Sequence, residues 1–384
     1  MRSPSFAEAA VAAVAEGPLP EDAIRRGFEL TVVVPTFNER DNVELVLERL
    51  DAALDGIEWE VVYVDDDSPD GTADKVRALA QDHPRVRCLQ RIGRRGLSTA
   101  VIEGMLSSSA PYFAVIDADL QHDAALLPRM LAALKEEALD IVIGSRRSPG
   151  GGVGDWDRRR VAISNVAAGL ARLVVAADLA DPMSGFFILS RPAFERAVRR
   201  LSGQGFKILL DLFASTPVAF RFKEMPYVFG RRQHGESKLD SFVIWEYLML
   251  LADKLVGGYV PARFISFAAI GGFGVVVHFT ALYLGLKLFA FPLAQAVATV
   301  VAMTSNFALN NVLTYRDRRL AGLRFVTGLV SFYAVCSLGA VANVGIASAA
   351  FADHYTWWAS GLAGAVVGVV WNYAVSSVLT WKRS

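Results

Sequence analysis

The stretch FAVIDADLQHD places two carboxylates, Asp117 and Asp119, at the end of an apolar run, with Gln121 and His122 close behind. Carboxylate and amide oxygens are hard ligands that suit Mg²⁺ or Mn²⁺, and such a cation binds the oxygens of a diphosphate. We therefore predict Asp119 and Gln121 as metal ligands. The competing interpretation is that these acids only begin a helix, a role that Asp123 fits best. His122 is predicted to support the ligands or the fold rather than to bind the metal, and no specific role is assigned to it.

The elements that would position these residues follow from hydrophobic periodicity. The predicted strands cover 30–34, 59–65, 86–89, 112–117 and 140–144, and the predicted helices cover 42–54, 71–81, 97–108 and 125–137. This alternation predicts an α/β fold with a doubly wound, mainly parallel sheet. Polar residues end four of the strands, at Pro35–Glu39, Asp65–Asp67, Asp117–Asp119 and Ser145–Arg146. Because ligands bind at the carboxyl ends of such strands, these four groups are predicted to form one site.

Several other functions are disfavoured by motif and composition. No GxGxxG follows the first predicted strand, and GxxxxGK[ST] is absent, which argues against a dinucleotide enzyme and a P-loop NTPase. The chain has 39 basic and 39 acidic residues, so nucleic acid is not an expected partner. The two cysteines, Cys88 and Cys336, lie in segments of different character, and no disulfide framework is predicted.

The last third of the chain is apolar and poor in acids. Four spans are long enough to cross a bilayer: 264–286, 293–315, 325–351 and 357–381. Lys287 is the only charge between Arg263 and Arg316. His278 and the amides of Asn306, Asn310 and Asn311 are polar residues within these spans, and we predict that they hold helices together.

Charge in the connecting loops predicts the orientation of the spans. Four arginines lie between the second and third spans, at 316, 318, 319 and 324, and Lys382 and Arg383 follow the fourth. Basic loops stay in the cytoplasm, so both termini and the front domain are predicted to be cytoplasmic. Tyr315, Trp357, Trp358 and Trp381 stand where an interfacial aromatic belt would lie.

These observations divide the chain into four parts. Residues 1–28 are predicted to be a mobile tail, 29–236 a catalytic domain, 237–260 amphipathic interfacial helices, and 261–384 an all-α domain of four transmembrane helices. For 237–260, an ordinary packed helix is the alternative. The glycine-rich, basic stretch RRSPGGGVGDWDRRR is predicted to be a loop beside the site, with Trp156 reaching the membrane interface.

Eight motifs in order resemble one family: VVVPTFNERDNV, VDDDSPDGT, GLSTAV, DADLQH, GSRR, DPMSGFF, GFKILLDL and GESKL. They are similar to the polyprenyl (dolichyl) phosphate mannosyltransferases of glycosyltransferase family 2. The four spans resemble a small GtrA-like family associated with O-antigen glucosylation. The resemblance implies a GT-A fold, a nucleotide-sugar donor, a lipid-linked phosphate acceptor and inversion at the anomeric carbon.

Carried over position by position, the resemblance implies the site residues. The nucleoside pocket would comprise Pro35, Phe37, Glu39, Val64 and Asp66, and the diphosphate and metal site Asp117, Ala118, Asp119 and Gln121. The acceptor-phosphate cradle would comprise Arg146, Arg160 and Ser164, with Arg146 touching both substrates, and later phosphate contacts Lys207, Arg232 and Lys238. Phe37 stands where tyrosine is frequent, so the ring is kept but a hydroxyl is lost. Asp117, Asp119, Arg146, Arg160 and Ser164 are the implied catalytic residues.

Three functions remain at this point. The first is metal-dependent transfer of mannose from GDP-mannose to a polyprenyl phosphate at the cytoplasmic membrane face. The second uses UDP-glucose with undecaprenyl phosphate. The third, of another class, is a non-catalytic membrane scaffold or lipid-carrier flippase. A lipid phosphate oxygen is already anionic near neutral pH and needs no general base, which agrees with the lack of a Ser-His-Asp or Cys-His pattern.

Overall fold

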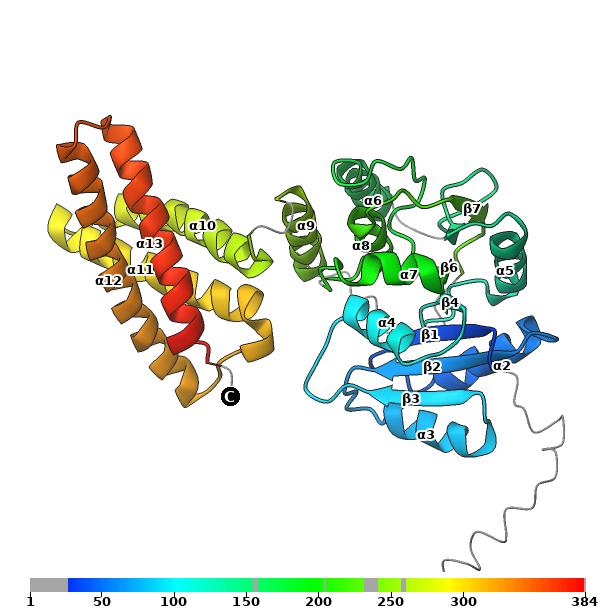
Figure 1. The fold of residues 1–384 in the computed structure, drawn as a ribbon. Helices are drawn as coiled ribbons and strands as arrows, with labels where there is room; N and C mark the ends of the chain where they lie inside the picture. The colour runs from blue at the N-terminus through cyan, green and yellow to red at the C-terminus, as the bar shows by residue number, and fades with distance from the viewer. Residues whose placement is uncertain (1–26, 155–157, 204, 231–240, 257–259, 383–384) are drawn as a thin grey trace, which may run out of the picture.

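The computed structural model describes residues 27–154, 158–203, 205–230, 241–256 and 260–382. Figure 1 shows a sheet domain and a group of long helices, with one helix between them. Within the described residues, the sheet has seven strands in the order β3-β2-β1-β4-β6-β5-β7. The strands are β1 Leu30–Thr36, β2 Trp59–Asp65, β3 Val86–Gln90, β4 Tyr112–Val115, β5 Ile141–Ser145, β6 Phe187–Ser190 and β7 Phe222–Pro226.

The prediction of a mainly parallel sheet is confirmed, with one antiparallel insertion. Strand β1 pairs in parallel with β2 and β4, β2 with β3, and β5 with β7. Strand β6 lies antiparallel between β4 and β5. The sequence prediction missed β6 and β7, because β6 has only four residues and β7 is a half-polar edge strand. The polar ends of β4 and β5 are therefore one strand apart.

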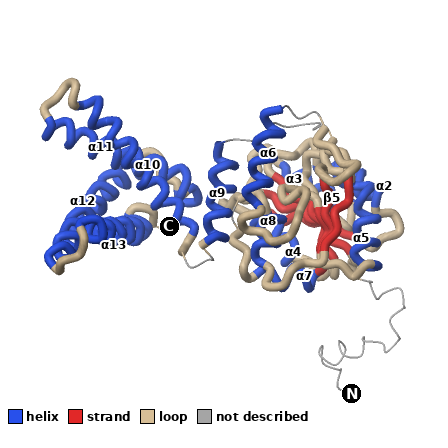
Figure 2. Tube along the Cα trace, turned by 90° about the horizontal axis from the view of Figure 1, so that it is seen from above, coloured by secondary structure: helices blue, strands red, loops and turns tan. Residues whose placement is uncertain are grey.

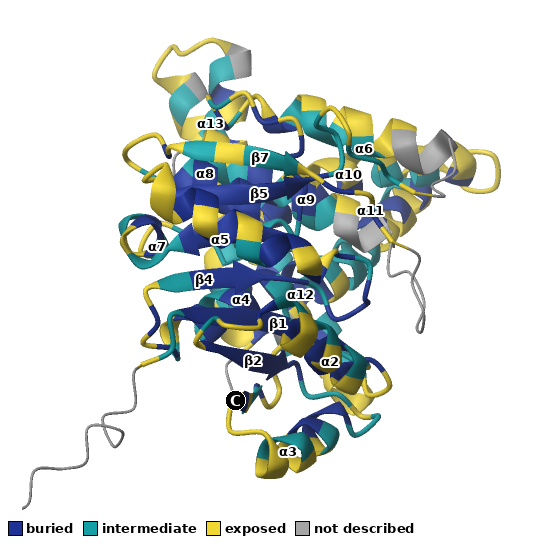
Figure 3. Cartoon of the chain, turned by 90° about the vertical axis from the view of Figure 1, so that its right-hand side faces the viewer, coloured by how far each residue is buried: buried dark blue, intermediate teal, exposed yellow. Residues whose placement is uncertain are grey.

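Helices cover both faces of the sheet. One face carries α2 Val43–Ala53, α3 Thr72–Asp82 and α5 Leu127–Glu136, and the other carries α4 Leu97–Leu106, α7 Arg191–Val198 and α8 Ile208–Ser215. Alternate strand residues serve the two cores: Val32 and Val34 face the first, and Val33 faces the second. In Figure 3 the central strands are buried and the outer helix faces are exposed. Gly104 lets α4 approach the sheet, because a Cβ there would meet the Val33 side chain.

Helix α9 (Ser241–Leu255) lies between the sheet domain and the long helices (Figure 2). The Tyr247 hydroxyl donates to the Ala167 carbonyl of α6 (Arg158–Ala171) at 2.6 Å. Lys254 forms a buried ion pair with Asp211 of α8, also at 2.6 Å. On a neighbouring face of α9, three apolar side chains are exposed, Ile244, Leu248 and Leu255. The two polar anchors, Tyr247 and Lys254, hold α9 against the sheet domain. The amphipathic, interfacial character predicted for 237–260 stays a prediction.

The prediction of four membrane-spanning helices agrees with the structure. Four helices are long and apolar enough to cross a membrane, over Arg263–Gly285, Phe291–Thr314, Leu323–Ala350 and Leu362–Leu379. They lie in α10 Ala262–Gly285, α11 Phe291–Leu309 with its π-helical extension η3 Asn310–Thr314, α12 Leu323–Ala352 and α13 Trp357–Leu379. Helix α10 packs against α11, and α12 packs against α13 (Figure 1). Four helices of this length and composition indicate a membrane protein, in which the sheet domain is a separate part of the chain.

The prediction of an interfacial belt is wrong for two of its four aromatic residues. Tyr315 and Trp381 are buried and stack on each other, with ring centroids 4.1 Å apart and planes 7° apart. Asn311 accepts hydrogen bonds from the Trp381 indole at 3.1 Å and from the Leu320 amide at 2.8 Å. This confirms the predicted packing role for Asn311. The side chains of Trp357 and Trp358 lie outside the described residues.

Candidate active site

The loop after β4 holds the two predicted carboxylates in a defined turn. The Asp117 amide donates to Nδ1 of His122 at 3.0 Å, and the Gln121 amide donates to Oδ1 of Asp119 at 3.2 Å. Leu120, between them, has φ of +64°, which is uncommon for a residue with a branched side chain. Asp123 accepts from the Ala125 amide, so the capping role predicted for Asp123 is confirmed.

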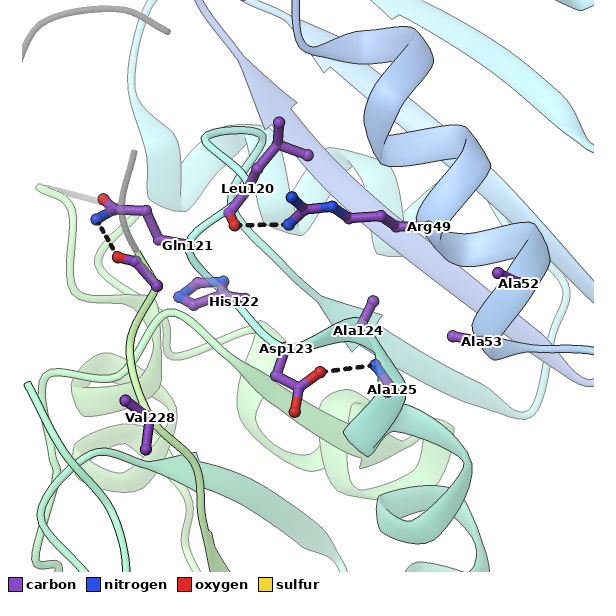
Figure 4. Close-up of a pocket in the computed structure, with 11 residues that line it drawn as sticks. Arg49, Ala52, Ala53, Leu120, Gln121, His122, Asp123, Ala124, Ala125 and Val228 are labelled. Carbon is purple, nitrogen blue, oxygen red and sulfur yellow. Dashed lines mark hydrogen bonds between the residues drawn. The ribbon is translucent and has the colours of Figure 1, made fainter. Parts of the chain in front are cut away.

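Two contacts from outside the loop hold this conformation (Figure 4). Arg49 of α2 donates from Nη1 to the Leu120 carbonyl at 2.8 Å. Gly230, after β7, exchanges two hydrogen bonds with Gln121: its amide donates to the Gln121 carbonyl at 2.8 Å, and its carbonyl accepts from Nε2 at 2.9 Å. A cavity of about 400 Å³ lies behind the loop. Its lining residues are Arg49, Ala52, Ala53, Leu120, Gln121, His122, Asp123, Ala124, Ala125, Val228 and Gly230.

Asp117 stands among charges of both signs. About a third of its side chain is exposed, yet the surrounding protein atoms desolvate the carboxylate and raise its pKa. The charges of His122, Lys207 and Arg146 act in the opposite direction, and the charge of Asp119 adds to the rise. The carboxylate lies close under Gly185, where a Cβ would come within 3.1 Å of Oδ2. The structure thus brings Asp117, Asp119, Arg146 and Lys207 into one electrostatic group.

His122 is a buried, neutral side chain behind Asp117. Its ring stacks on Phe186 with centroids 5.2 Å apart and meets Tyr227 and Phe229 edge to face. Burial lowers the pKa of His122. Because Nδ1 accepts the Asp117 amide, the ring proton must be on Nε2, which lies 3.7 Å from the Asp117 carboxylate. His122 thus packs among aromatic rings and contacts Asp117, which agrees with a supporting role.

Arg146 is held by a buried acid that sequence reasoning did not assign. Asp181, in the DPMSGFF motif, accepts from Nε at 2.7 Å and from Nη2 at 2.8 Å of the Arg146 guanidinium. Burial acts to raise the pKa of Asp181, but the hydrogen bonds and charge of Arg146 outweigh it and lower the pKa. Glu224 of β7 in turn accepts from the amides of Ala180 and Asp181. A phosphate contact by Arg146 would therefore share the guanidinium with Asp181.

The next residue, Arg147, reaches the predicted acceptor region. It donates to the Ser164 hydroxyl of α6 at 2.7 Å, which places Ser164 beside the end of β5. Lys207 precedes α8, and its ammonium lies 3.5 Å from the Met183 carbonyl. Arg160 lies in α6, but its side chain is outside the described residues. Arg232, Lys238 and Trp156 also lie outside them.

The ends of β1 and β2 form the predicted nucleoside side of the site. Phe37 is half-buried, and the Arg95 guanidinium lies 4.1 Å from its ring centroid, a contact that sequence reasoning missed. The Glu39 carboxylate accepts from the side-chain Nδ2 of Asn42 at 2.6 Å, which ties it to the start of α2. Pro35 is half-buried beside Phe37.

Two residues assigned to the nucleoside pocket, Val64 and Asp66, are buried in the protein interior. Val64 is fully buried in the second core, and Ala118, assigned to the diphosphate site, is buried in the first. Asp66 accepts from Arg91 Nη1 at 2.8 Å and from the Gly96 amide at 2.7 Å. Burial raises the pKa of Asp66, and these partners partly offset the rise. The Asp66–Arg91 pair positions the loop that carries Arg95.

The donor set at Asp119 and Gln121 fits a hard divalent cation. Among the described residues, no group of three or more His, Cys, Asp or Glu side chains is placed to hold a metal ion. One carboxylate is nevertheless what Mg²⁺ takes when substrate phosphates and waters supply its other ligands. Gln121 donates from its nitrogen to Gly230, so its amide oxygen is the atom that would face a cation. Asp119 and Gln121 would thus hold Mg²⁺ or Mn²⁺ together with a diphosphate.

Comparisons with known proteins find a family match for each of the two domains and relatives that cover both domains. Residues 31–197 match glycosyl transferase family 2, and residues 266–381 match the GtrA/DPMS transmembrane domain. A dolichol-phosphate mannosyltransferase of Pyrococcus furiosus is 34% identical over 92% of this chain and 99% of its own length. The enzyme of the same name from Saccharomyces cerevisiae is 38% identical over 62% of this chain and 92% of its own. Among solved structures, glucosyl-3-phosphoglycerate synthase from Mycobacterium tuberculosis is 20% identical, with a TM-score of 0.43 over 59% of this chain and 78% of that one.

Proposed function

Because the chain belongs to the dolichol-phosphate mannosyltransferases, glycosyltransferases with a family 2 domain, we propose that it transfers mannose from GDP-mannose to a polyprenyl phosphate. The observation that carries the proposal is the electrostatic group of Asp117, Asp119, Arg146 and Lys207 at the strand ends. Such a group can receive two anionic substrates, because the acids bind through a cation and the bases contact phosphate directly.

The reaction would be a single displacement. An anionic oxygen of the lipid phosphate attacks the anomeric carbon of mannose, the bond from that carbon to the diphosphate breaks, and GDP leaves with the bonding electrons. Attack on the face opposite the diphosphate inverts the configuration. A bound Mg²⁺ or Mn²⁺ supplies charge stabilisation to the leaving diphosphate.

The protein residues have separate tasks in this proposal. Asp117, whose backbone amide donates a hydrogen bond to Nδ1 of His122, orients the sugar. Arg146 and Lys207 bring positive charge to the two phosphate groups, and Asp181 keeps the Arg146 guanidinium in place. Ser164 and Arg160 of α6 line the acceptor side, together with Arg147. The nucleoside would lie against Pro35, Phe37 and Glu39, while the buried Val64 and Asp66 hold the end of β2 and the loop that carries Arg95. Arg232 and Lys238 are expected to add further phosphate contacts.

We further propose that the catalytic domain and both termini are cytoplasmic, with α9 at the membrane interface. The basic residues Arg316 and Lys382 follow the second and fourth spans on one side of the bundle. Arg316 also pairs with Glu246 of α9 at 3.1 Å, which keeps α9 at that side. Single cysteines at Arg319 and His354, in a background without Cys88 and Cys336, test this. A membrane-impermeant maleimide should label only His354→Cys from the outside, and the reverse labelling contradicts the orientation.

Transfer is tested directly with the full-length protein in detergent. GDP-mannose with a radiolabelled sugar, Mn²⁺ and a polyprenyl phosphate should yield labelled lipid, and chelation by EDTA should abolish it. Label transferred from UDP-glucose but not from GDP-mannose would contradict the choice of sugar. No transfer from either donor would favour a scaffold or flippase.

A further inference from the structure

Helices α11 and α13 end in the same sequence pattern. Asn306–Arg316 reads NFALNNVLTYR, and Asn372–Lys382 reads NYAVSSVLTWK. Five of the eleven positions are identical, and the others exchange similar residues, such as Phe for Tyr, Tyr for Trp and Arg for Lys. The shift between the two segments is 66 residues. The same shift relates the starts of the helices, at Phe291 and Trp357.

Each of these helices carries a stripe of small or polar residues at every fourth position. In α11 and η3 the stripe is Ala294, Ala298, Ala302, Asn306, Asn310 and Thr314, and in α13 it is Ser360, Gly364, Gly368, Asn372, Ser376 and Thr380. Residues four apart lie on one helix face, and small side chains there let membrane helices approach closely. The two stripes match position by position under the shift of 66.

The stripes make the same contacts with their partner helices. Ser266 of α10 meets the Thr314 hydroxyl at 2.7 Å, and Ser331 of α12 meets the Thr380 hydroxyl at 3.1 Å. A Cβ on Gly274 of α10 would collide with the Asn306 amide, and a Cβ on Gly339 of α12 would collide with the Asn372 amide. Ser331 follows Ser266 by 65 residues, and Gly339 follows Gly274 by the same 65 residues. Each hairpin therefore repeats one packing pattern.

The ends of the two hairpins also bend in the same way. The Tyr315 amide donates to the Asn310 carbonyl at 2.8 Å, and the Trp381 amide donates to the Ser376 carbonyl at 3.0 Å. Both are bonds across five residues, the π-helical spacing. A shared departure from α-helical geometry at matching positions is an observation independent of the residue identities.

Contacts between the hairpins have the symmetry that two equivalent units produce. Phe267 packs on Tyr373 with centroids 5.7 Å apart, and Phe332 packs on Phe307 at the same 5.7 Å. Phe267 in the first hairpin corresponds to Phe332 in the second, and Tyr373 in the second corresponds to Phe307 in the first. The two ring contacts are therefore the same contact with the hairpins exchanged. The stacked rings of Tyr315 and Trp381 are each other's counterpart, and contact between counterparts places them on a twofold axis.

We propose that the four-span domain is a duplicated helical hairpin, in which α10–α11 and α12–α13 associate as two copies of one unit. The surface of each unit is centred on Tyr315 or Trp381, and the partner that it fits is a second hairpin with the same stripe. Both units begin and end on the same side, so the pseudo-twofold axis runs along the membrane normal. This inference is independent of the sugar and the lipid.

The main departure from the repeat has a local cause. Asn311 corresponds to Ser377, yet Asn311 bonds Leu320 and Trp381, whereas Ser377 donates only within its own helix, to Ala374 among its described partners. The segment that contains Leu320 connects the two hairpins. Asn311 is therefore specialised to hold this connection.

The first test is disulfide mapping in the full-length protein lacking Cys88 and Cys336. Cysteine pairs at 267/373 and at 332/307 should both form on oxidation in membranes, with yields within about twofold of each other, because the duplication makes the two contacts equivalent. Cross-linking of only one pair would overturn the proposal.

The second test exchanges residues between the repeats. Phe307→Tyr, Leu309→Val, Asn310→Ser and Tyr315→Trp give the first hairpin the residues of the second. The control places the same four residues at wrong positions, as Phe307→Ser, Leu309→Tyr, Asn310→Trp and Tyr315→Val. Exchange should shift the Tm in detergent by less than about 3 °C and the control by more than about 8 °C. Equal losses of Tm in the two variants would overturn the proposal.

Discussion

The sheet domain and the four-span domain use polar side chains in different places. In the sheet domain, many acids and bases follow strand ends, where backbone amides of the loops bind them, as with Asp66 and Asp119. In the four-span domain, the polar residues lie inside helices and contact the neighbouring helix, as with Ser266 and Asn311. Strand ends are open to substrate, whereas a polar group within a bilayer must find a protein partner. Substitutions should therefore affect turnover in the first region and assembly in the second.

The largest effect is expected where a polar residue of the sheet domain is both buried and near the site. Asp181→Asn leaves the buried Arg146 without a counter-charge, which should lower the free energy of unfolding by about 3–5 kcal/mol and reduce transfer as well. The measurement is denaturant unfolding of the detergent-solubilised protein. Asp178→Asn is the matched control. The Asp178 side chain is 97% exposed, and its pair with Arg172 is long, at 4.0 Å, so its loss should change stability little. Equal stabilities of the two variants would contradict the role of the pair.

Asp119→Ala should separate turnover from folding. Loss of the carboxylate that would hold the cation is expected to lower turnover by about 10³-fold, roughly 4 kcal/mol, with little change in Tm. Asp123→Ala, four residues away, removes only a capping bond and should cost about 1 kcal/mol of stability while transfer is retained. Full activity of Asp119→Ala would show that the metal assignment is wrong.

The pH dependence of stability follows from Asp181. Its pKa is lowered in the folded protein, so its contribution is present above the unfolded pKa of about 3.9 and is lost as pH falls through the folded pKa. The difference in stability between the wild type and Asp181→Asn should be constant from about pH 7 to pH 5 and shrink below about pH 4. A difference that grows on acidification would contradict this assignment. Unfolding curves at several pH values measure it.

In both the sheet domain and the four-span domain, the features that could be predicted from the sequence are those that one segment encodes by itself. Strands β1, β2 and β5 are apolar runs that end in polar motifs, so both the sheet and the place of its site followed from local patterns. The four spans followed from length and hydropathy in the same way. In both cases the information lies within a single segment.

Features that depend on two distant segments were not predictable. Asp181 lies 35 residues from Arg146, and only the fold brings the carboxylate to the guanidinium. The stretch of β6 is too short to mark an antiparallel strand, although it separates β4 from β5. Tyr315 and Trp381 were placed in a lipid-facing belt, because hydropathy does not fix how a helix is rotated toward its partner.

A smaller effect is expected from Asn311→Leu in the four-span domain. Loss of the bonds to Trp381 and Leu320 should lower the Tm by a few degrees, about 1–2 kcal/mol, while transfer per folded molecule stays unchanged. Ser377→Leu is the control, because Ser377 occupies the matching position in the second hairpin and bonds within its own helix. A drop in turnover of Asn311→Leu without loss of Tm would remove the distinction between the two regions.

The smallest effect should come from Arg49, which lies on α2 and donates to the Leu120 carbonyl of the loop. Arg49→Ala removes the bond to the Leu120 carbonyl, so the loop is expected to relax from the uncommon φ of +64° at a gain of about 1 kcal/mol. The dissociation constant of Mn²⁺, measured by electron paramagnetic resonance with GDP present, should rise about fivefold, with turnover at saturating Mn²⁺ little changed.

Two variants make the effect of Arg49 specific to the loop. Arg49→Lys keeps a donor near Leu120 and should recover part of the Mn²⁺ affinity, whereas Arg129→Ala, at an exposed position on α5, should leave it unchanged. If Arg49→Ala lowered turnover at saturating Mn²⁺ but not Mn²⁺ affinity, the contact would act on the sugar nucleotide through Asp117 instead. In that case the loop after β4 would keep its conformation without Arg49, because the two hydrogen bonds between Gln121 and Gly230 would be enough to hold it.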